Sequence, residues 1–166
     1  MKWKQTVIAR GLADRLPQAV WEGPILFYDA SCLLCSSLVA YILRHDRRGT
    51  LSFARLDGPL AAALRGRDCW RHPVDSMVWF EADPMTLHAV STMRSTAVVS
   101  LARYLGGPWA VIANATCWLP PDFRDQCYDL VAKWRFRLRH PPSSCRILPP
   151  HQRARVLEMR VPPEGS

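Results

Sequence analysis

The stretch PILFYDASCLLCSSLVAYILRHD, from Pro24 to Asp46, holds two cysteines that are separated by two residues. Its first part, Ile25–Tyr28, is a short run of β-branched and aromatic residues after a proline, which is typical of a buried strand. From Cys32 to His45, apolar residues recur at helical spacing. The stretch therefore predicts a strand, a short turn and a helix whose first turn carries both thiols.

Two cysteines at this spacing can form a disulfide staple, half of a zinc site or a redox couple. The first turn of a helix has unpaired backbone N–H groups and a partial positive charge, and both stabilise a thiolate. Cys32 is therefore the candidate attacking thiol. Cys35 lies one turn further along on the same side, and we expect it to be the less exposed, resolving thiol. Such an exchange moves two electrons and needs no bound cofactor and no metal.

Asp29 lies three positions before Cys32, and two roles for its carboxylate stay open. If it is buried, it would relay a proton to or from Cys35 as a general acid–base group. If it is exposed, it would only cap the helix, as Ser31 also could. In either role its negative charge would oppose formation of a nearby thiolate.

The composition is that of an ordinary globular protein, since 49% of the 166 residues are apolar and 22% are charged. This length fits one domain with a proper hydrophobic core. No unbroken apolar stretch follows the lysines near the N-terminus, so we expect a cytoplasmic protein without a secretory signal. In such a reducing compartment, a close cysteine pair is more often catalytic or metal-binding than a permanent disulfide.

Strand and helix signals alternate after the first helix. Further strands are expected at 51–56, 76–82 and 85–93, and helices at 58–66, 94–107, 108–120 and 122–140. A strand–helix–strand start gives a parallel pair, and the hairpin of the last two strands adds antiparallel pairing. This is the order of a thioredoxin-like α/β (α+β) fold. We expect a mixed sheet of about four strands, flanked by helices, with extra C-terminal helices and the cysteine pair at the active-site position.

Three segments are expected along the chain. Residues 1–23 would be an N-terminal extension that could include a short helix, and 24–140 the thioredoxin-like domain with its C-terminal basic helix. Residues 141–166 would be a Pro-rich basic tail, in which 151–159 could form a helical turn. The net charge is +8, and 124–160 supplies six of these charges, because nine Arg or Lys stand there against three acids. A basic end of this kind can attract an anionic partner.

Residues 27–35, FYDASCLLC, resemble the DCC family of predicted thiol-disulfide oxidoreductases. The family is named for the pattern Asp-x-x-Cys-x-x-Cys, which here is Asp29, Cys32 and Cys35. A weaker likeness extends over about residues 24 to 150, in the stretches LSFARLD, STAVVSLARYLGG, DLVAKWRFRLRH and CRILPP. The resemblance implies a thioredoxin-like fold and disulfide exchange with a protein or small-molecule thiol or disulfide. It defines neither the substrate nor the electron donor.

Two features of better-known thioredoxin-like proteins differ here. The residues between the cysteines are Leu33 and Leu34 rather than Gly-Pro, and no tryptophan precedes Cys32. Many such proteins also have a cis-proline directly before the third strand, facing the thiols. Pro73 lies three residues before Ser76 and is the candidate for that role.

A structural zinc site is the first alternative, and it needs four ligands in tetrahedral geometry. Cys32 and Cys35 would supply two, and Cys69 with His72 is the nearest second pair. Otherwise Cys69 is interpreted as a core or near-surface residue, like two further cysteines, Cys117 and Cys127.

A non-catalytic basic binding protein is the second alternative. The stretch KWRFRLRH, 133–140, interleaves aromatic residues with arginines, a pattern that can serve nucleic acid or a membrane surface. The simpler interpretation places Trp134 and Leu138 in the core and the arginines outward. Cys145, beside Arg146, would be a third redox thiol or an incidental one.

Overall fold

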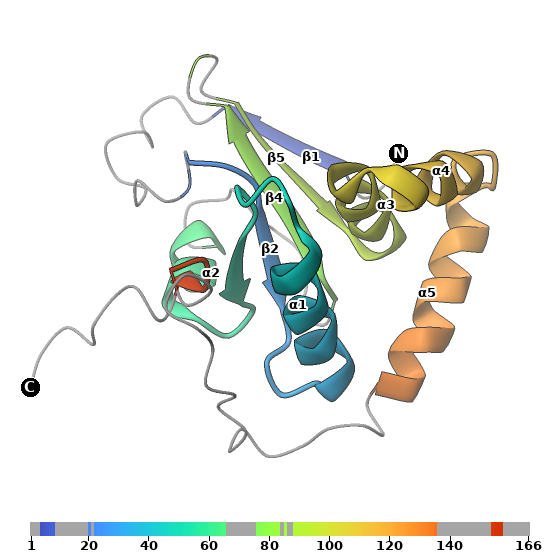
Figure 1. The fold of residues 1–166 in the computed structure, drawn as a ribbon, viewed down its shortest axis with the longest axis horizontal. Coiled ribbons are helices and arrows are strands. Elements are labelled where there is room, and N and C mark those ends of the chain that lie inside the picture. Colours follow the sequence, from blue (N-terminus) through green and yellow to red (C-terminus); the bar gives the residue numbers. More distant parts are fainter. Residues whose placement is uncertain are drawn as a thin grey trace, which may run out of the picture.

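The computed structural model describes residues 4–8, 20, 22–65, 76–83, 85, 88–135 and 154–157. These residues form five strands and five helices (Figure 1). The strands are β1 (Lys4–Ile8), β2 (Ile25–Tyr28), β3 (Ser52–Arg55), β4 (Val78–Asp83) and β5 (His88–Met93). The helices are α1 (Leu33–His45), α2 (Pro59–Arg65), α3 (Arg94–Leu105), α4 (Gly107–Thr116) and α5 (Pro121–Arg135).

The strands form one mixed sheet in the order β1-β5-β4-β2-β3. Strands β2 and β3 are parallel and are joined through α1, while β4 pairs antiparallel with both β2 and β5. The four predicted strands and the helices between them are confirmed. The fold is thioredoxin-like, with α4 and α5 as the extra helices after α3.

Strand β1 is a fifth strand that the sequence analysis did not predict. It pairs antiparallel with β5, in a register that runs from Lys4 opposite Thr92 to Ile8 opposite His88. Part of the expected N-terminal extension therefore belongs to the sheet. The segment boundaries at residues 24 and 141 stay predictions.

Each face of the sheet carries its own core because successive strand side chains point to opposite faces. On one face, Phe27 and Phe80 pack edge-to-face and join α2 through Leu64. On the other face, Leu26 belongs to a cluster that also includes Ile42 of α1 and further side chains of α3. Strand β2 is thus buried from both sides, as its continuous apolar run predicts.

Helix α1 buries one side in the domain. Its buried residues are Cys35, Val39, Ile42 and Leu43. Leu34 and Tyr41, two of the apolar residues that recur at helical spacing, are exposed. Tyr41 instead stacks on His45 on the helix surface, at a ring distance of 4.2 Å.

The side of helix α5 that faces the rest of the domain is not the side expected from the sequence. Its inner side bonds through polar atoms: Asp125 accepts from the Ser95 hydroxyl of α3, and the Tyr128 hydroxyl accepts from the Met77 N–H at 3.0 Å. Trp134 is 63% exposed, so the assignment of Trp134 to the core is wrong. Leu138 lies outside the described residues.

A C-terminal segment, 154–157, lies along the free edge of β3. Val156 forms a parallel bridge with Phe53, and the Phe53 N–H donates to the Arg155 carbonyl at 2.7 Å. The Arg155 guanidinium pairs with Asp46, just after α1, and donates to the Leu51 carbonyl at 2.8 Å. Tyr104 of α3 donates to the same Asp46 carboxylate at 3.1 Å, so Asp46 links this segment to α3.

Candidate active site

The two thiols lie where the sequence predicts them, between the carboxyl end of β2 and the start of α1. Cys32 is the N-cap residue of α1, with extended backbone angles (φ −93°, ψ 117°), and Cys35 lies in the first turn. Strand β2 holds the residues just before the motif in place, because its side chains are buried on both faces of the sheet. The pair therefore lies between the first parallel strand and the helix that follows it.

A tight turn built on Asp29 connects β2 to the cysteines. The Asp29 Oδ1 atom accepts from the Ser31 N–H at 2.9 Å and from the Ser31 hydroxyl at 2.6 Å. The Cys32 N–H donates to the Asp29 carbonyl at 3.2 Å. The expected cap of α1 by Asp29 or Ser31 is wrong, because Cys32 itself holds the N-cap position and its side chain makes no capping hydrogen bond. The Asp29 carboxylate instead shapes the turn that positions Cys32.

Both thiols are buried. Cys32 is 1% exposed and Cys35 is 5% exposed, so the expectation that Cys35 would be the less exposed of the two is wrong. The two residues between them, Leu33 and Leu34, are instead exposed, at 43% and 45%. A disulfide that approaches α1 would meet this leucine pair first.

Strand β3 brings a charged pair to the same edge of the sheet, because the carboxyl ends of parallel strands β2 and β3 lie side by side. The Leu56 N–H donates to the Tyr28 carbonyl at 3.0 Å, and Arg55 pairs with Asp57 at 2.7 Å. The Arg55 hydrogen bond holds the pKa of the Asp57 carboxyl below its usual value. Parallel pairing of the two strands is the signal that could have placed this charged pair near the motif.

The other candidate residues are exposed cysteines or lie outside the described residues. Cys117 and Cys127 are exposed, as the near-surface interpretation predicts. Cys69, His72, Pro73 and Cys145 lie outside the described residues. Across the described part of the chain, no group of three or more His, Cys, Asp or Glu could hold a metal ion. The same residues include no helix long and apolar enough to cross a bilayer.

A pocket of about 510 Å³ lies at the other end of the sheet. It is lined by residues before the amino ends of β2 and β3 and by side chains of β4 and α3: Pro24, Arg48, Thr50, Trp79, Glu81, Ser100, Arg103 and Tyr104. No cysteine is among them, so the pocket is separate from the thiol pair.

The fold and the position of the thiols together define a thioredoxin-like protein with a Cys-x-x-Cys motif at the start of its first sheet-flanking helix. The model of the DCC1-like thiol-disulfide oxidoreductase family matches residues 26–140. The chain belongs to this family, which supports a redox role and thiol-bearing partners.

Two relatives extend the likeness beyond the motif. The uncharacterized protein YuxK of Bacillus subtilis (strain 168) is 27% identical over 134 residues, which cover 80% of this chain and 93% of YuxK. A chloroplastic DCC family protein of Arabidopsis thaliana is 29% identical over 128 residues, which cover 76% of this chain and 70% of that protein. No solved structure matches the chain.

Proposed function

We propose that the protein is an enzyme that exchanges a dithiol for a disulfide through Cys32 and Cys35. The observation that carries this proposal is the position of Cys32 as the N-cap residue of α1. At that position the backbone N–H groups of the first helical turn and the helix dipole favour a negatively charged sulfur. Cys35, one turn later, is spaced to close a disulfide with it.

The proposed reaction balances with two electrons. The Cys32 thiolate attacks a substrate disulfide, forms a mixed disulfide and releases one substrate thiolate. Cys35 then loses its proton and attacks the Cys32 sulfur, which releases the second substrate thiolate and leaves a Cys32–Cys35 disulfide. The proton from Cys35 ends on a released thiolate, and Asp29 is the candidate group to carry it. A cellular thiol donor restores the reduced pair.

Burial of the thiols adds one requirement to this scheme. With Cys32 1% exposed, a substrate disulfide reaches the sulfur only after the surface around the start of α1 opens. The exposed Leu33 and Leu34 are the first contacts that such a substrate makes. This supports a protein or small-molecule disulfide with apolar groups beside its sulfurs.

Trapping of the mixed disulfide tests the assignment of the two thiols. We expect Cys35→Ser to accumulate a covalent adduct with a model disulfide, because the attacking thiol remains and the resolving thiol is gone. We expect Cys32→Ser to form no adduct and to lose turnover with dithiothreitol as reductant. Cys127→Ser, which removes an exposed cysteine of α5, is the matched control and should turn over like the unmodified protein.

Two other results would overturn this assignment. A Cys32→Ser protein that is fully active, or that forms the adduct itself, would reverse or remove the role of Cys32. One tightly held zinc ion per chain, lost in Cys32→Ser, would favour the structural zinc alternative. The proposal also places the enzyme in the cytoplasm, and cell fractionation tests that compartment.

A further inference from the structure

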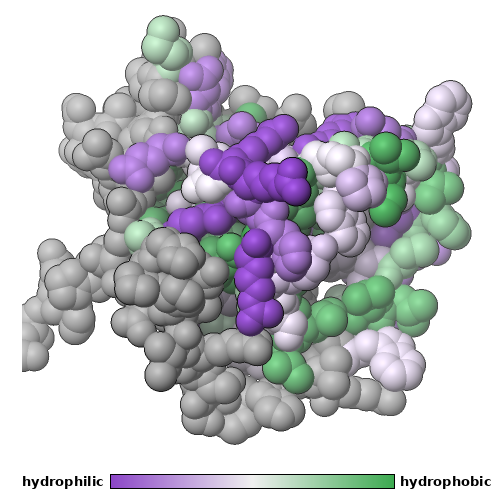
Figure 2. Space-filling view, viewed as in Figure 1, coloured by the Kyte–Doolittle hydropathy of each residue, from purple (hydrophilic) through white to green (hydrophobic). Residues whose placement is uncertain are grey.

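The outer side of α4 and α5 is unusually apolar for a protein surface. Figure 2 shows green, hydrophobic side chains along the right-hand margin of the molecule, over these two helices. We call the exposed residues that form it the outer apolar surface: Val111, Ile112, Trp118, Leu119, Phe123, Leu130, Val131 and Trp134. Apolar patches of this extent mark interaction sites.

On α5 the apolar residues form one stripe. Phe123, Leu130 and Trp134 are spaced by seven and four positions, which places them on the same side of a helix. The opposite side carries the buried Asp125, bonded to Ser95 of α3. The helix thus uses a polar contact to attach to the domain and turns its apolar side to the outside.

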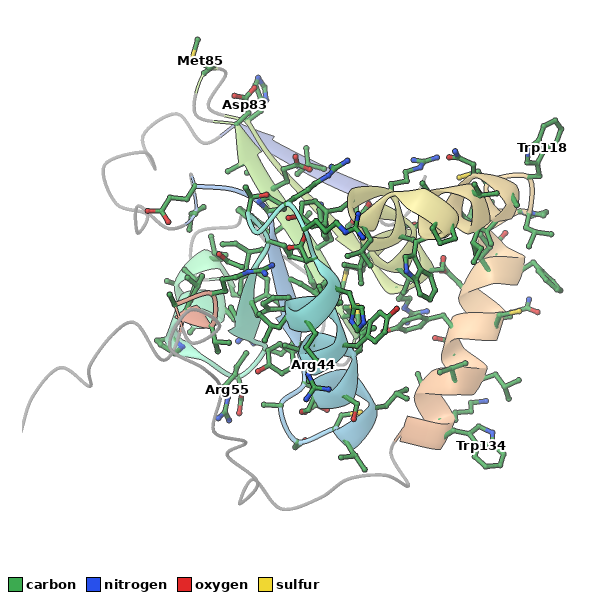
Figure 3. The ribbon with its side chains drawn as sticks, in the orientation of Figure 1. Arg44, Arg55, Asp83, Met85, Trp118 and Trp134 are labelled. Atoms are coloured by element: carbon green, nitrogen blue, oxygen red, sulfur yellow. The ribbon has the colours of Figure 1, made fainter. Side chains whose placement is uncertain are left out.

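Helix α4 and the link to α5 have the same character. Residues 107–120 contain no charged side chain, and Ala113 is the buried residue of α4. Trp118 is 92% exposed. Figure 3 shows Trp118 and Trp134 near opposite ends of α5, both pointing away from the sheet. Tryptophans in this arrangement suit the boundary between water and lipid, where an amphipathic ring lies between polar and apolar surroundings.

The charges of α5 itself balance, with three acids against three bases, but residues 124–160, which begin in α5, supply six of the eight net positive charges of the chain. Asp125 is buried and bonded to Ser95, whereas Asp129 pairs with Arg94 at 3.3 Å with 48% of its side chain exposed. Asp122, in the first turn, is an exposed acid that complements the helix dipole. Lys133 is exposed on α5, and the chain as a whole carries a net charge of +8.

The same net charge decides between two possible occupants. A second copy of the chain would bring +8 against +8, and this repulsion opposes self-association. An anionic bilayer attracts the protein and also accepts the apolar stripe. We propose that the outer apolar surface is a docking site for an anionic lipid surface, on which α4 and α5 lie with Trp118 and Trp134 at the interface.

Vesicle sedimentation with the full chain tests this proposal. We expect the protein to sediment with vesicles of phosphatidylcholine and phosphatidylserine, and much less with phosphatidylcholine alone. The double variant Leu130→Ser/Trp134→Ser should lower the partition coefficient about tenfold or more, because two anchoring side chains are removed. Lys133→Gln should lower it about fivefold, and less at high salt.

Met85→Ser is the matched control. Met85 is 91% exposed, and Figure 3 shows it at the far side of the molecule from α5. We expect Met85→Ser to bind vesicles like the unmodified protein, and Cys32→Ser to do so as well. The proposal is overturned if the unmodified protein stays in the supernatant at low salt. It is also overturned if the double variant only converts a dimer to a monomer, or only loses binding to duplex DNA.

Discussion

Asp29 has a structural role in the motif beside the proton transfer proposed for it. Its carboxylate accepts two hydrogen bonds from Ser31 and so forms the turn that leads into Cys32. The proton relay and the helix cap suggested by the sequence would both direct the Asp29 carboxylate toward α1. The turn itself was predicted, but its two hydrogen bonds to Ser31 were not, because the sequence does not show which neighbouring donor a carboxylate will accept from.

Substitution of Asp29 separates shape from proton transfer. Asp29→Asn keeps an oxygen acceptor for the turn but removes a group that can carry a proton. If Asp29 serves Cys35, we expect this variant to resolve the mixed disulfide about 100-fold more slowly in stopped-flow measurements. Ser31→Ala removes only the hydroxyl contact, and its resolving rate should be nearly unchanged. Equal rates for Asp29→Asn and the unmodified protein would leave Asp29 with the turn alone.

Elements inside the sheet could be predicted closely from the sequence, whereas those at its margin could not. The run Ile25–Tyr28 is observed as β2 with the predicted bounds, since both of its neighbours are strands and both of its faces are covered. The position of helix α5 was predicted, but its buried side was not, because periodicity marks an apolar side without showing whether the protein covers it. Strand β1 was missed because its partners in β5 lie 80 to 88 residues away in the sequence, from Ile8 opposite His88 to Lys4 opposite Thr92.

The contact of the C-terminal segment with α1 leads to a prediction of stability. The Asp46 side chain is 1% exposed and its carboxylate is bonded by Arg155 and Tyr104. Arg155→Met removes the buried cation, and we expect the free energy of unfolding to fall by about 3 kcal/mol. Urea denaturation measures this loss.

A double variant separates the effect of the unpaired Asp46 charge from the effect of the lost Arg155 side chain. Asp46→Asn combined with Arg155→Met removes both charges, and we expect it to recover part of the lost stability. A loss within about 0.5 kcal/mol for Arg155→Met alone would mean that the pair is not formed in solution.

At the scale of the whole molecule, segments from the two ends of the sequence pair with the sheet, so that β1 rather than β5 is the edge strand on one side. Strand β1 lies on β5, and the bridge of Val156 lies on β3. An uncovered edge strand presents unpaired N–H and C=O groups to other chains. Neither segment is part of the matched residues 26–140.

A fragment cut to residues 26–140 should therefore associate with itself. It loses β1 and the segment of Val156, together with the Arg155 contact to Asp46. We expect light scattering to show aggregation of the fragment at concentrations where the full chain stays monodisperse. A monodisperse fragment with an unchanged unfolding midpoint would show that neither end protects the sheet.

The Cys32–Cys35 pair is buried, whereas Cys117 and Cys127 are exposed. This difference decides how the redox state of the pair must be assayed. Colorimetric reagents will titrate Cys117 and Cys127 well before Cys32 and Cys35, because reagent access follows exposure. A total thiol count on the folded protein therefore mainly reports Cys117 and Cys127, which take no part in the proposed exchange. Peptide-resolved mass spectrometry after denaturation in acid is the readout that follows the pair itself.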